Sequence, residues 1–118
     1  MSVKRIVPNL ASPDPAGSAD FYIGVFGLKV AMDMGWIVTL TSPEAASAQI
    51  SLLRSDPKQP HPDYTVEVTD LEECHGRALA AAYEIVYPLT DEPWGVRRFF
   101  VRDPNGKIAN VMTHSPTG

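Results

Sequence analysis

Hydrophobic and polar positions along the chain follow strand-like and helix-like periods in an order that repeats once. Asp14 and Asp70 each open a helix-like segment, and the two positions are 56 residues apart. A shift of 61 residues superimposes segment 36–43 on segment 97–104. Because a repeated order of elements is the signature of repeat architectures, the pattern predicts two similar halves.

The first half reads as a strand, a helix and three further strands. Asp14 is a favourable N-cap followed by a proline, and Gly27 marks the end of the helix. Apolar residues recur at helical spacing within it, at Tyr22, Val25 and Phe26. Strands are expected at residues 4–11, 28–34, 36–41 and 48–53. Pro8 marks the first of them as an edge strand or an irregular one.

The second half repeats this order. Thr69 and Glu72 form a capping-box pattern before a helix whose apolar face includes Cys74, with His75 expected on the solvent side. Strands are expected at residues 64–70, 84–89, 97–102 and 107–113. The chain is therefore predicted to have an α+β fold of two tandem βαβββ modules, at about 1–55 and 62–118, within one domain. Each helix is expected on one face of a mostly antiparallel sheet.

Strand parity predicts which side chains point away from the helices. Phe99 and Val101 are expected in the helix-packed core, as are Ile6 and Leu10 of the first strand. The opposite face then mixes polar and apolar side chains: Asn9, Ile37, Gln49, Asp63, Glu67, Arg98, Phe100, Asn110 and Met112. This mixture is typical of a small-molecule pocket, although a solvent-facing surface or a subunit interface would have the same pattern.

Charge and composition exclude several classes of function. The net charge is −4 and the basic residues are scattered, so no phosphate-binding stripe is expected and nucleic acid is not a predicted partner. Cys74 is the only cysteine, which excludes an intrachain disulfide and favours a reducing compartment. Neither a signal peptide nor a membrane span is expected, so a cytoplasmic protein is predicted.

Three segments resemble the vicinal oxygen chelate superfamily, which includes glyoxalase I, extradiol dioxygenases and bleomycin resistance proteins. They are "FYIGVFGLKV" (21–30), "VTDLEE" (68–73) and "EPWGVRRFFVRDPNGKIANV" (92–111). The resemblance implies a paired βαβββ fold whose curled sheet encloses a cleft. It also implies a divalent metal in the catalytic relatives, bound at positions that correspond here to Val7, Gln49, Asp63 and Asn110.

These four residues make a poor metal site. Val7 has no donor atom, and a neutral amide oxygen binds a divalent cation more weakly than a carboxylate or an imidazole. No metal and no cofactor are therefore expected, although Asp63, Gln49 and Asn110 together leave a weak site open. The chain is closest to the metal-free, bleomycin-resistance-like branch, and no catalytic residue is assigned.

The resemblance therefore favours a metal-independent protein that binds a small molecule, sequestering an antibiotic or a toxic metabolite in clefts of a homodimer. Metal-dependent lyase, isomerase or dioxygenase activity is the alternative, and a non-catalytic dimerisation module is a second one. The predicted ligand-binding residues include two tryptophans suited to stacking on planar ligands. The full set is Asn9, Trp36, Gln49, Asp63, Glu67, Trp94, Arg98, Phe100, Asn110 and Met112.

Overall fold

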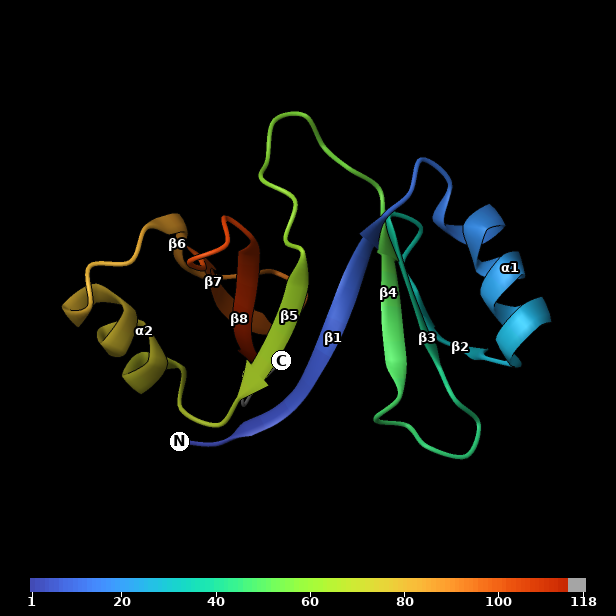
Figure 1. Ribbon diagram of the computed structural model, residues 1–118, viewed down its shortest axis with the longest axis horizontal. Coiled ribbons are helices and arrows are strands. Elements are labelled where there is room, and N and C mark those ends of the chain that lie inside the picture. The colour runs from blue at the N-terminus through green and yellow to red at the C-terminus, as the bar shows by residue number, and fades with distance from the viewer. Residues whose placement is uncertain (115–118) are drawn as a thin grey trace. The chain divides into compact units, whose positions relative to one another are not determined.

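The computed structural model describes residues 1–114, which form eight strands and two helices (Figure 1). In chain order they are β1 (Val3–Ala11), α1 (Pro15–Phe26), β2 (Lys29–Asp33), β3 (Ile37–Thr41), β4 (Gln49–Leu53), β5 (Tyr64–Val68), α2 (Leu71–Ala80), β6 (Ile85–Asp91), β7 (Val96–Arg102) and β8 (Ile108–His114). The predicted α+β class and the repeated βαβββ order are confirmed. The last four residues of the expected second module lie outside the described residues.

The chain divides into two compact units. The first unit comprises residues 7–61, and the second comprises residues 1–6 together with the chain from residue 62 onward. The first six residues, expected in the first module, thus group with the second. None of the helices in residues 1–114 is long and apolar enough to cross a membrane.

In the first unit the strand order is β2-β3-β4-β1, with β4 and β1 parallel and the other pairs antiparallel. Asp14 caps α1 as predicted, because its carboxylate accepts a hydrogen bond from Gly17 N at 3.1 Å. Gly27 ends the helix in the left-handed region, at φ 71°. α1 packs on β3 and β4 over a core of buried apolar residues: Ala19, Val38, Leu40 and Leu52.

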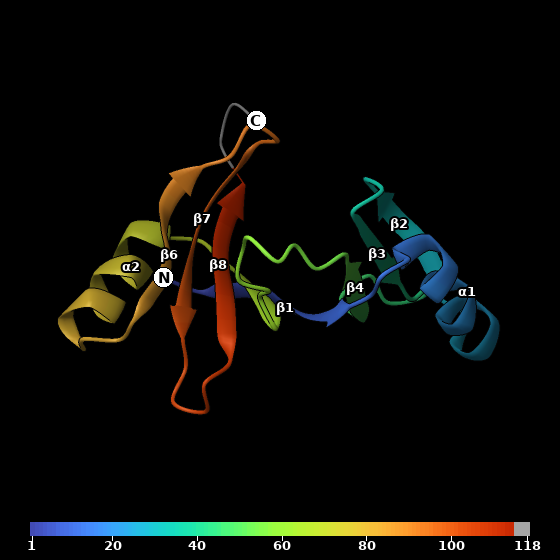
Figure 2. The ribbon, with the colours of Figure 1, turned by 90° about the horizontal axis from the view of Figure 1, so that it is seen from above.

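In the second unit the strand order is β5-β8-β7-β6, and only the β5–β8 pair is parallel. α2 packs against β6, β7 and β8 (Figure 2). The core between them consists of Val68, Leu71, Phe99, Ala109 and Val111, and Cys74 packs against it as predicted.

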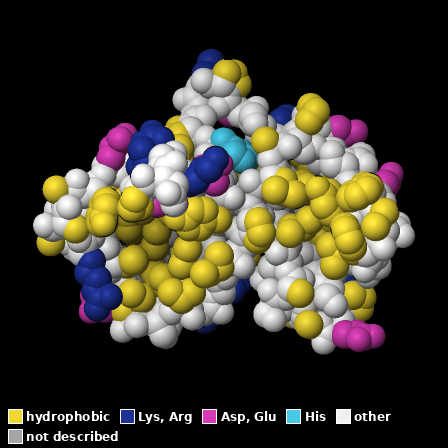
Figure 3. All heavy atoms as spheres, in the orientation of Figure 1, with side chains coloured by type: hydrophobic (Ala, Val, Ile, Leu, Met, Phe, Trp, Pro, Cys, Tyr) yellow, Lys and Arg dark blue, Asp and Glu magenta, His cyan; other side chains and the backbone are white. Residues whose placement is uncertain are grey.

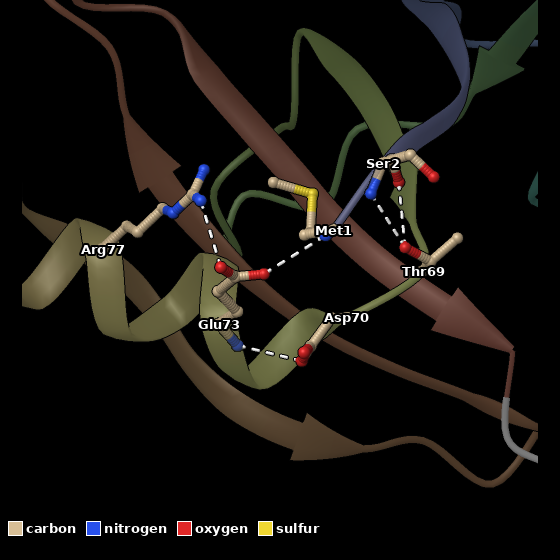
Figure 4. A network of polar contacts seen from close by, with 6 residues as sticks. All are labelled: Met1, Ser2, Thr69, Asp70, Glu73 and Arg77. Atoms are coloured by element: carbon tan, nitrogen blue, oxygen red, sulfur yellow. Dashed lines mark hydrogen bonds and ion pairs between the residues drawn. The ribbon is translucent and has the colours of Figure 1, made fainter.

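The start of α2 differs from the predicted capping box. Asp70, not Thr69, is the N-cap, and its carboxylate accepts a hydrogen bond from Glu73 N at 3.1 Å (Figure 4). The Thr69 hydroxyl instead accepts a hydrogen bond from Ser2 N at 2.8 Å. The prediction was wrong by one residue because Thr69 and Asp70 are both good capping types, and Thr69 is used by the N-terminal segment instead.

Some predicted burial is also wrong. Ile6 is 60% exposed and Leu10 37%. Within the first unit α1 packs on β3 and β4, so Leu10 on the neighbouring β1 is left partly open. His75 was expected in solvent, but its ring meets the edge of Phe99 at 4.9 Å.

The "DPNG" turn between β7 and β8 is organised by Asp103. One carboxylate oxygen accepts hydrogen bonds from Asn105 N at 2.8 Å and Lys107 N at 3.0 Å, and the other accepts one from the Tyr64 hydroxyl at 3.0 Å. Gly106 completes the turn at φ 80°, a conformation that favours glycine. This motif therefore builds the turn, and its carboxylate is fully used.

The contact between Asp103 and Tyr64 affects the pKa values of both side chains. Desolvation works against ionisation of Asp103, but the backbone donors Lys107 and Asn105 and the Tyr64 hydroxyl outweigh it, so its pKa lies below the ordinary value. Burial, followed by the bond to Asp103, raises the pKa of Tyr64. A depressed carboxyl pKa stabilises the fold above the unfolded-state pKa, and that stability is lost as the pH falls through the folded-state pKa.

We expect Asp103→Asn to flatten the acid side of the stability curve. Wild-type protein should lose more free energy of unfolding between pH 6 and pH 3 than the variant, as measured by urea unfolding at each pH. The exposed Asp20 on α1 provides the control, since Asp20→Asn should keep the wild-type pH dependence. Equal pH dependence in wild type and Asp103→Asn would contradict this role of the carboxylate.

Candidate functional site

The second unit has a sheet face that no helix of its own covers, termed here the helix-free face. Phe99 and Val101 of β7 pack towards α2, so the alternating residues Arg98 and Phe100 point the other way. On β8, Ala109 and Val111 are in the core, which leaves Asn110 and Met112 on the helix-free face. The predicted parity of these two strands is confirmed.

Strand register arranges the helix-free face as two rows of side chains. Asn110 lies opposite Phe100, with Thr65 of β5 beside Asn110 and Tyr87 of β6 beside Phe100. The second row runs parallel to it and consists of Glu67, Met112, Arg98 and Thr90. Each row thus begins at a polar residue of β5, Thr65 or Glu67, and ends on the edge strand β6.

Arg98 lies at the centre of an aromatic cluster. Its guanidinium carbon is 5.2 Å from the ring centroids of Tyr87 and Trp94 and 4.9 Å from that of Phe100. Nη2 pairs with Glu92 Oε2 at 2.7 Å, and the Tyr87 hydroxyl donates to Glu92 Oε1 at 3.1 Å. Arg98 is 13% exposed and Glu92 8%, so this is a buried ion pair held by cation–π contacts.

Two buried polar atoms of the helix-free face have no hydrogen-bond partner within residues 1–114: Arg98 Nε and Asn110 Oδ1. The amide nitrogen of Asn110 donates to Thr65 Oγ1 at 3.2 Å, which orients the side chain and leaves the oxygen as an available acceptor. Native proteins satisfy nearly all buried polar groups, because an unpaired one costs about 1–3 kcal/mol. One donor and one acceptor of this face are therefore unsatisfied within the described part of the chain.

The predicted carboxylates of this unit are used in its own structure. Asp63 Oδ2 accepts a hydrogen bond from Ile108 N at 2.8 Å, where the chain enters β8. Glu67 Oε1 accepts one from Arg5 Nε at 2.6 Å, and Lys4 Nζ lies 3.7 Å from the other oxygen. Glu67 lies on the helix-free face as predicted, but both carboxylates already have protein partners.

The other predicted residues lie in the first unit. Asn9 is buried beside Ser51, in the row where the hydroxyls of Thr39 and Ser51 are 2.8 Å apart. Gln49 is half-buried at the start of β4, opposite Thr41. Trp36 lies at the turn before β3 and is 38% exposed. Asn9, Gln49 and Ser51 lie on the side of this sheet opposite α1, because Val38, Leu40 and Leu52 pack towards the helix.

Two members of the aromatic cluster, Tyr87 and Glu92, were missed by the sequence reasoning. β6 shifts register between Ile85 and Tyr87 and again between Tyr87 and Thr90. Each irregularity changes which side chains share a face, so simple alternation cannot assign Tyr87. The usable signal was the cluster of aromatic and charged types between residues 87 and 98.

The metal positions implied by the resemblance do not hold a suitable donor set. Val7 has no donor, Asp63 is bonded to the backbone of Ile108, and Asn110 offers one neutral oxygen. Within residues 1–114, no three His, Cys, Asp or Glu side chains are grouped so that they could hold a metal ion. The residues present do not fit the divalent metal of the catalytic relatives.

Residues 3–108 match the family model described as "Glyoxalase/Bleomycin resistance protein/Dioxygenase superfamily". No curated protein matches the chain. Among solved structures, a member of that superfamily from Vibrio splendidus 12B01 is 22% identical, with a TM-score of 0.73 over 95% of this chain and 99% of that one.

Two other similar structures carry names of different activities. A variant of methylmalonyl-CoA epimerase from Streptomyces coelicolor, in complex with 2-nitronate-propionyl-CoA, is 15% identical, with a TM-score of 0.71 over 96% of this chain and 99% of that one. A structure described as NAD-dependent benzaldehyde dehydrogenase from Legionella pneumophila is 14% identical, with a TM-score of 0.76 over 93% and 99%. At such identities the similarity shows the shared fold alone.

Proposed function

Because the chain belongs to the glyoxalase/bleomycin resistance protein/dioxygenase superfamily, we propose that it binds a small molecule on the helix-free face of its second unit without a metal ion. Sequestration of a toxic compound is the role that such binding would serve. The observation that carries the proposal is the buried, unpartnered pair Arg98 Nε and Asn110 Oδ1. A cytoplasmic location and the absence of a cofactor remain predictions.

The chemistry of the face supports binding rather than catalysis. The aromatic rings of Tyr87, Trp94 and Phe100 offer flat apolar surface, and ligand pockets typically combine such surface with a few placed polar groups. Asp63 and Glu67, the predicted candidates for acid–base chemistry, are held by hydrogen bonds and ion pairs of the protein itself. The buried Glu92 is likewise committed to Arg98 and Tyr87.

A thermal-shift panel tests the proposal. EDTA-treated protein is screened against small aromatic compounds and antibiotics, including bleomycin, and at least one compound should stabilise it. A ligand at 100 times its dissociation constant adds about 2.7 kcal/mol to the free energy of unfolding. Stabilisation that requires added Ni, Zn, Mn or Fe would instead favour the metal-dependent alternative.

We expect Asn110→Ala to weaken binding of a stabilising compound roughly 5- to 150-fold, because a ligand donor would lose its acceptor and be buried unpaired. Isothermal titration calorimetry measures the change. The matched control is Asn105→Ala, since Asn105 is an exposed asparagine whose backbone N–H bond to Asp103 survives the substitution. Equal affinities in the two variants would contradict a contact with Asn110.

We also propose that the chain forms a homodimer. Hydrophobic side chains gather into patches on the face seen in Figure 3. On α1, Phe21 is 57% exposed, Val25 61% and Phe26 64%, and such a row of large apolar side chains is usual at subunit interfaces. Light scattering at micromolar concentration should give twice the 12.9 kDa chain mass, whereas a monomer mass would contradict the proposal.

A further inference from the structure

The chemistry of the helix-free face also identifies a class of ligand. Resting on the proposed binding function, we infer that the ligand is neutral and planar, and that it carries a carbonyl acceptor and an N–H donor, as a carboxamide or lactam does. Three observations carry the inference. They are the pairing of the buried charges on the face, the donor and acceptor character of Arg98 Nε and Asn110 Oδ1, and the aromatic rings beside them.

The buried charges of the helix-free face are already paired within the protein, and Lys4, a further cation near Glu67, is 59% exposed to solvent. The Arg98 guanidinium is paired with the buried Glu92 carboxylate at 2.7 Å. The Glu67 carboxylate is paired with Arg5 at 2.6 Å and lies 3.7 Å from Lys4. A charged ligand would bring an uncompensated charge into a largely desolvated place, which is costly, whereas a neutral polar ligand would not.

The two unpartnered atoms need opposite hydrogen-bonding groups. Arg98 Nε carries an N–H and requires an acceptor, whereas Asn110 Oδ1 requires a donor. Phe100 lies directly opposite Asn110, and Arg98 is two residues before Phe100, so Arg98 and Asn110 are diagonal neighbours. Diagonal Cβ atoms of an antiparallel pair lie about 7–8 Å apart, which is close enough for one small ligand to reach both groups.

Aromatic surface adjoins both groups. Phe100 is 3% exposed and contacts the Arg98 guanidinium, while Trp94, in the β6–β7 turn, also contacts it and is 42% exposed. Trp94 is therefore the most exposed ring that contacts Arg98, and it offers a flat surface on which a ligand near Arg98 could stack. A planar ligand gains from such stacking, which favours a conjugated amide over an aliphatic one.

Three naphthalene compounds test the need for an N–H donor and for a neutral ligand. 2-Naphthamide has a carbonyl and an N–H donor, methyl 2-naphthoate has acceptors only, and 2-naphthoate is an anion. Calorimetric titration of the EDTA-treated chain should give 2-naphthamide an affinity roughly tenfold or more above that of either relative. In Asn110→Ala the amide should lose this advantage over the ester. Arg98→Lys keeps the charge beside Glu92 but removes the Nε–H, and should weaken both neutral compounds.

Tighter binding of 2-naphthoate, or an amide advantage that survives Asn110→Ala, would overturn the inference while leaving the proposed function intact. If none of the three compounds binds but a compound without an amide stabilises the protein in the thermal-shift panel, the inference about the ligand class is overturned. The proposed function would still stand. Failure of all three compounds together with an empty panel would overturn the proposed function itself. Thermal melts of each variant without ligand establish that the variants fold.

Discussion

Replacing Phe99 by alanine should lower the free energy of unfolding by about 3–5 kcal/mol, the largest effect expected of any core substitution here. Phe99 of β7 is fully buried in the core beneath α2, and its ring centroid lies 4.9 Å from that of His75. The alanine variant loses the transfer free energy of the ring and leaves a cavity that the sheet cannot close. Urea unfolding at constant pH measures the loss.

The control is Tyr83→Ala, just after α2 and outside the proposed dimer surface, where an aromatic ring is 49% exposed. Its removal should cost less than about 1 kcal/mol, as is usual for exposed positions. Losses of equal size at the two positions would mean that Phe99 is not in a packed core. The face assignment of Arg98 and Phe100 depends on Phe99, so that result would also remove the basis for the site.

Arg98→Met should be nearly as damaging, at about 3–5 kcal/mol, because it leaves the Glu92 carboxylate buried without its partner. The side chain of Glu92 is only 8% exposed, and it also accepts a hydrogen bond from the Tyr87 hydroxyl. Adding Glu92→Gln to Arg98→Met removes the stranded charge. The double variant should therefore recover most of the lost stability, and urea unfolding of all three variants gives the coupling energy.

The exposed pair Arg77–Glu73 on α2 provides a matched comparison. Its side chains are 66% and 39% exposed, and its nitrogen–oxygen distance is 3.0 Å. Arg77→Met should change the free energy of unfolding by less than about 1 kcal/mol, as surface ion pairs usually do. Additive losses in Arg98→Met and Glu92→Gln, with no recovery in the double variant, would show that the two residues are not coupled.

Regular strands made much of this fold predictable from the sequence. β7 and β8 alternate strictly, so the positions of Phe99 and Val111 in the core fixed those of Arg98 and Asn110 on the other face. The limits of α1 followed from Asp14 and Gly27, whose capping preferences depend on local geometry alone. Local signals of this kind need no knowledge of the neighbouring elements.

Predictions that depended on neighbouring elements were less accurate. The bulges of β6 concealed Tyr87, and the competition between Thr69 and Asp70 for the cap was decided by Ser2, which is distant in sequence. Asp63 has the right chemistry for a ligand contact, yet the backbone of Ile108 takes its carboxylate. Burial of Leu10 depended on how far α1 extends over the sheet of the first unit. Alternation along one strand carries none of this information.

The central claim is that the helix-free face of the second unit binds a small molecule without a metal. Its most direct test is a nuclear magnetic resonance titration of ¹⁵N-labelled, EDTA-treated protein with the most stabilising compound of the thermal-shift panel. We expect the largest shifts for the Asn110 side-chain amide, the Arg98 Nε–H and the backbone of Phe100. Shifts confined to the first unit, or shifts that appear only after a divalent metal is added, would contradict it.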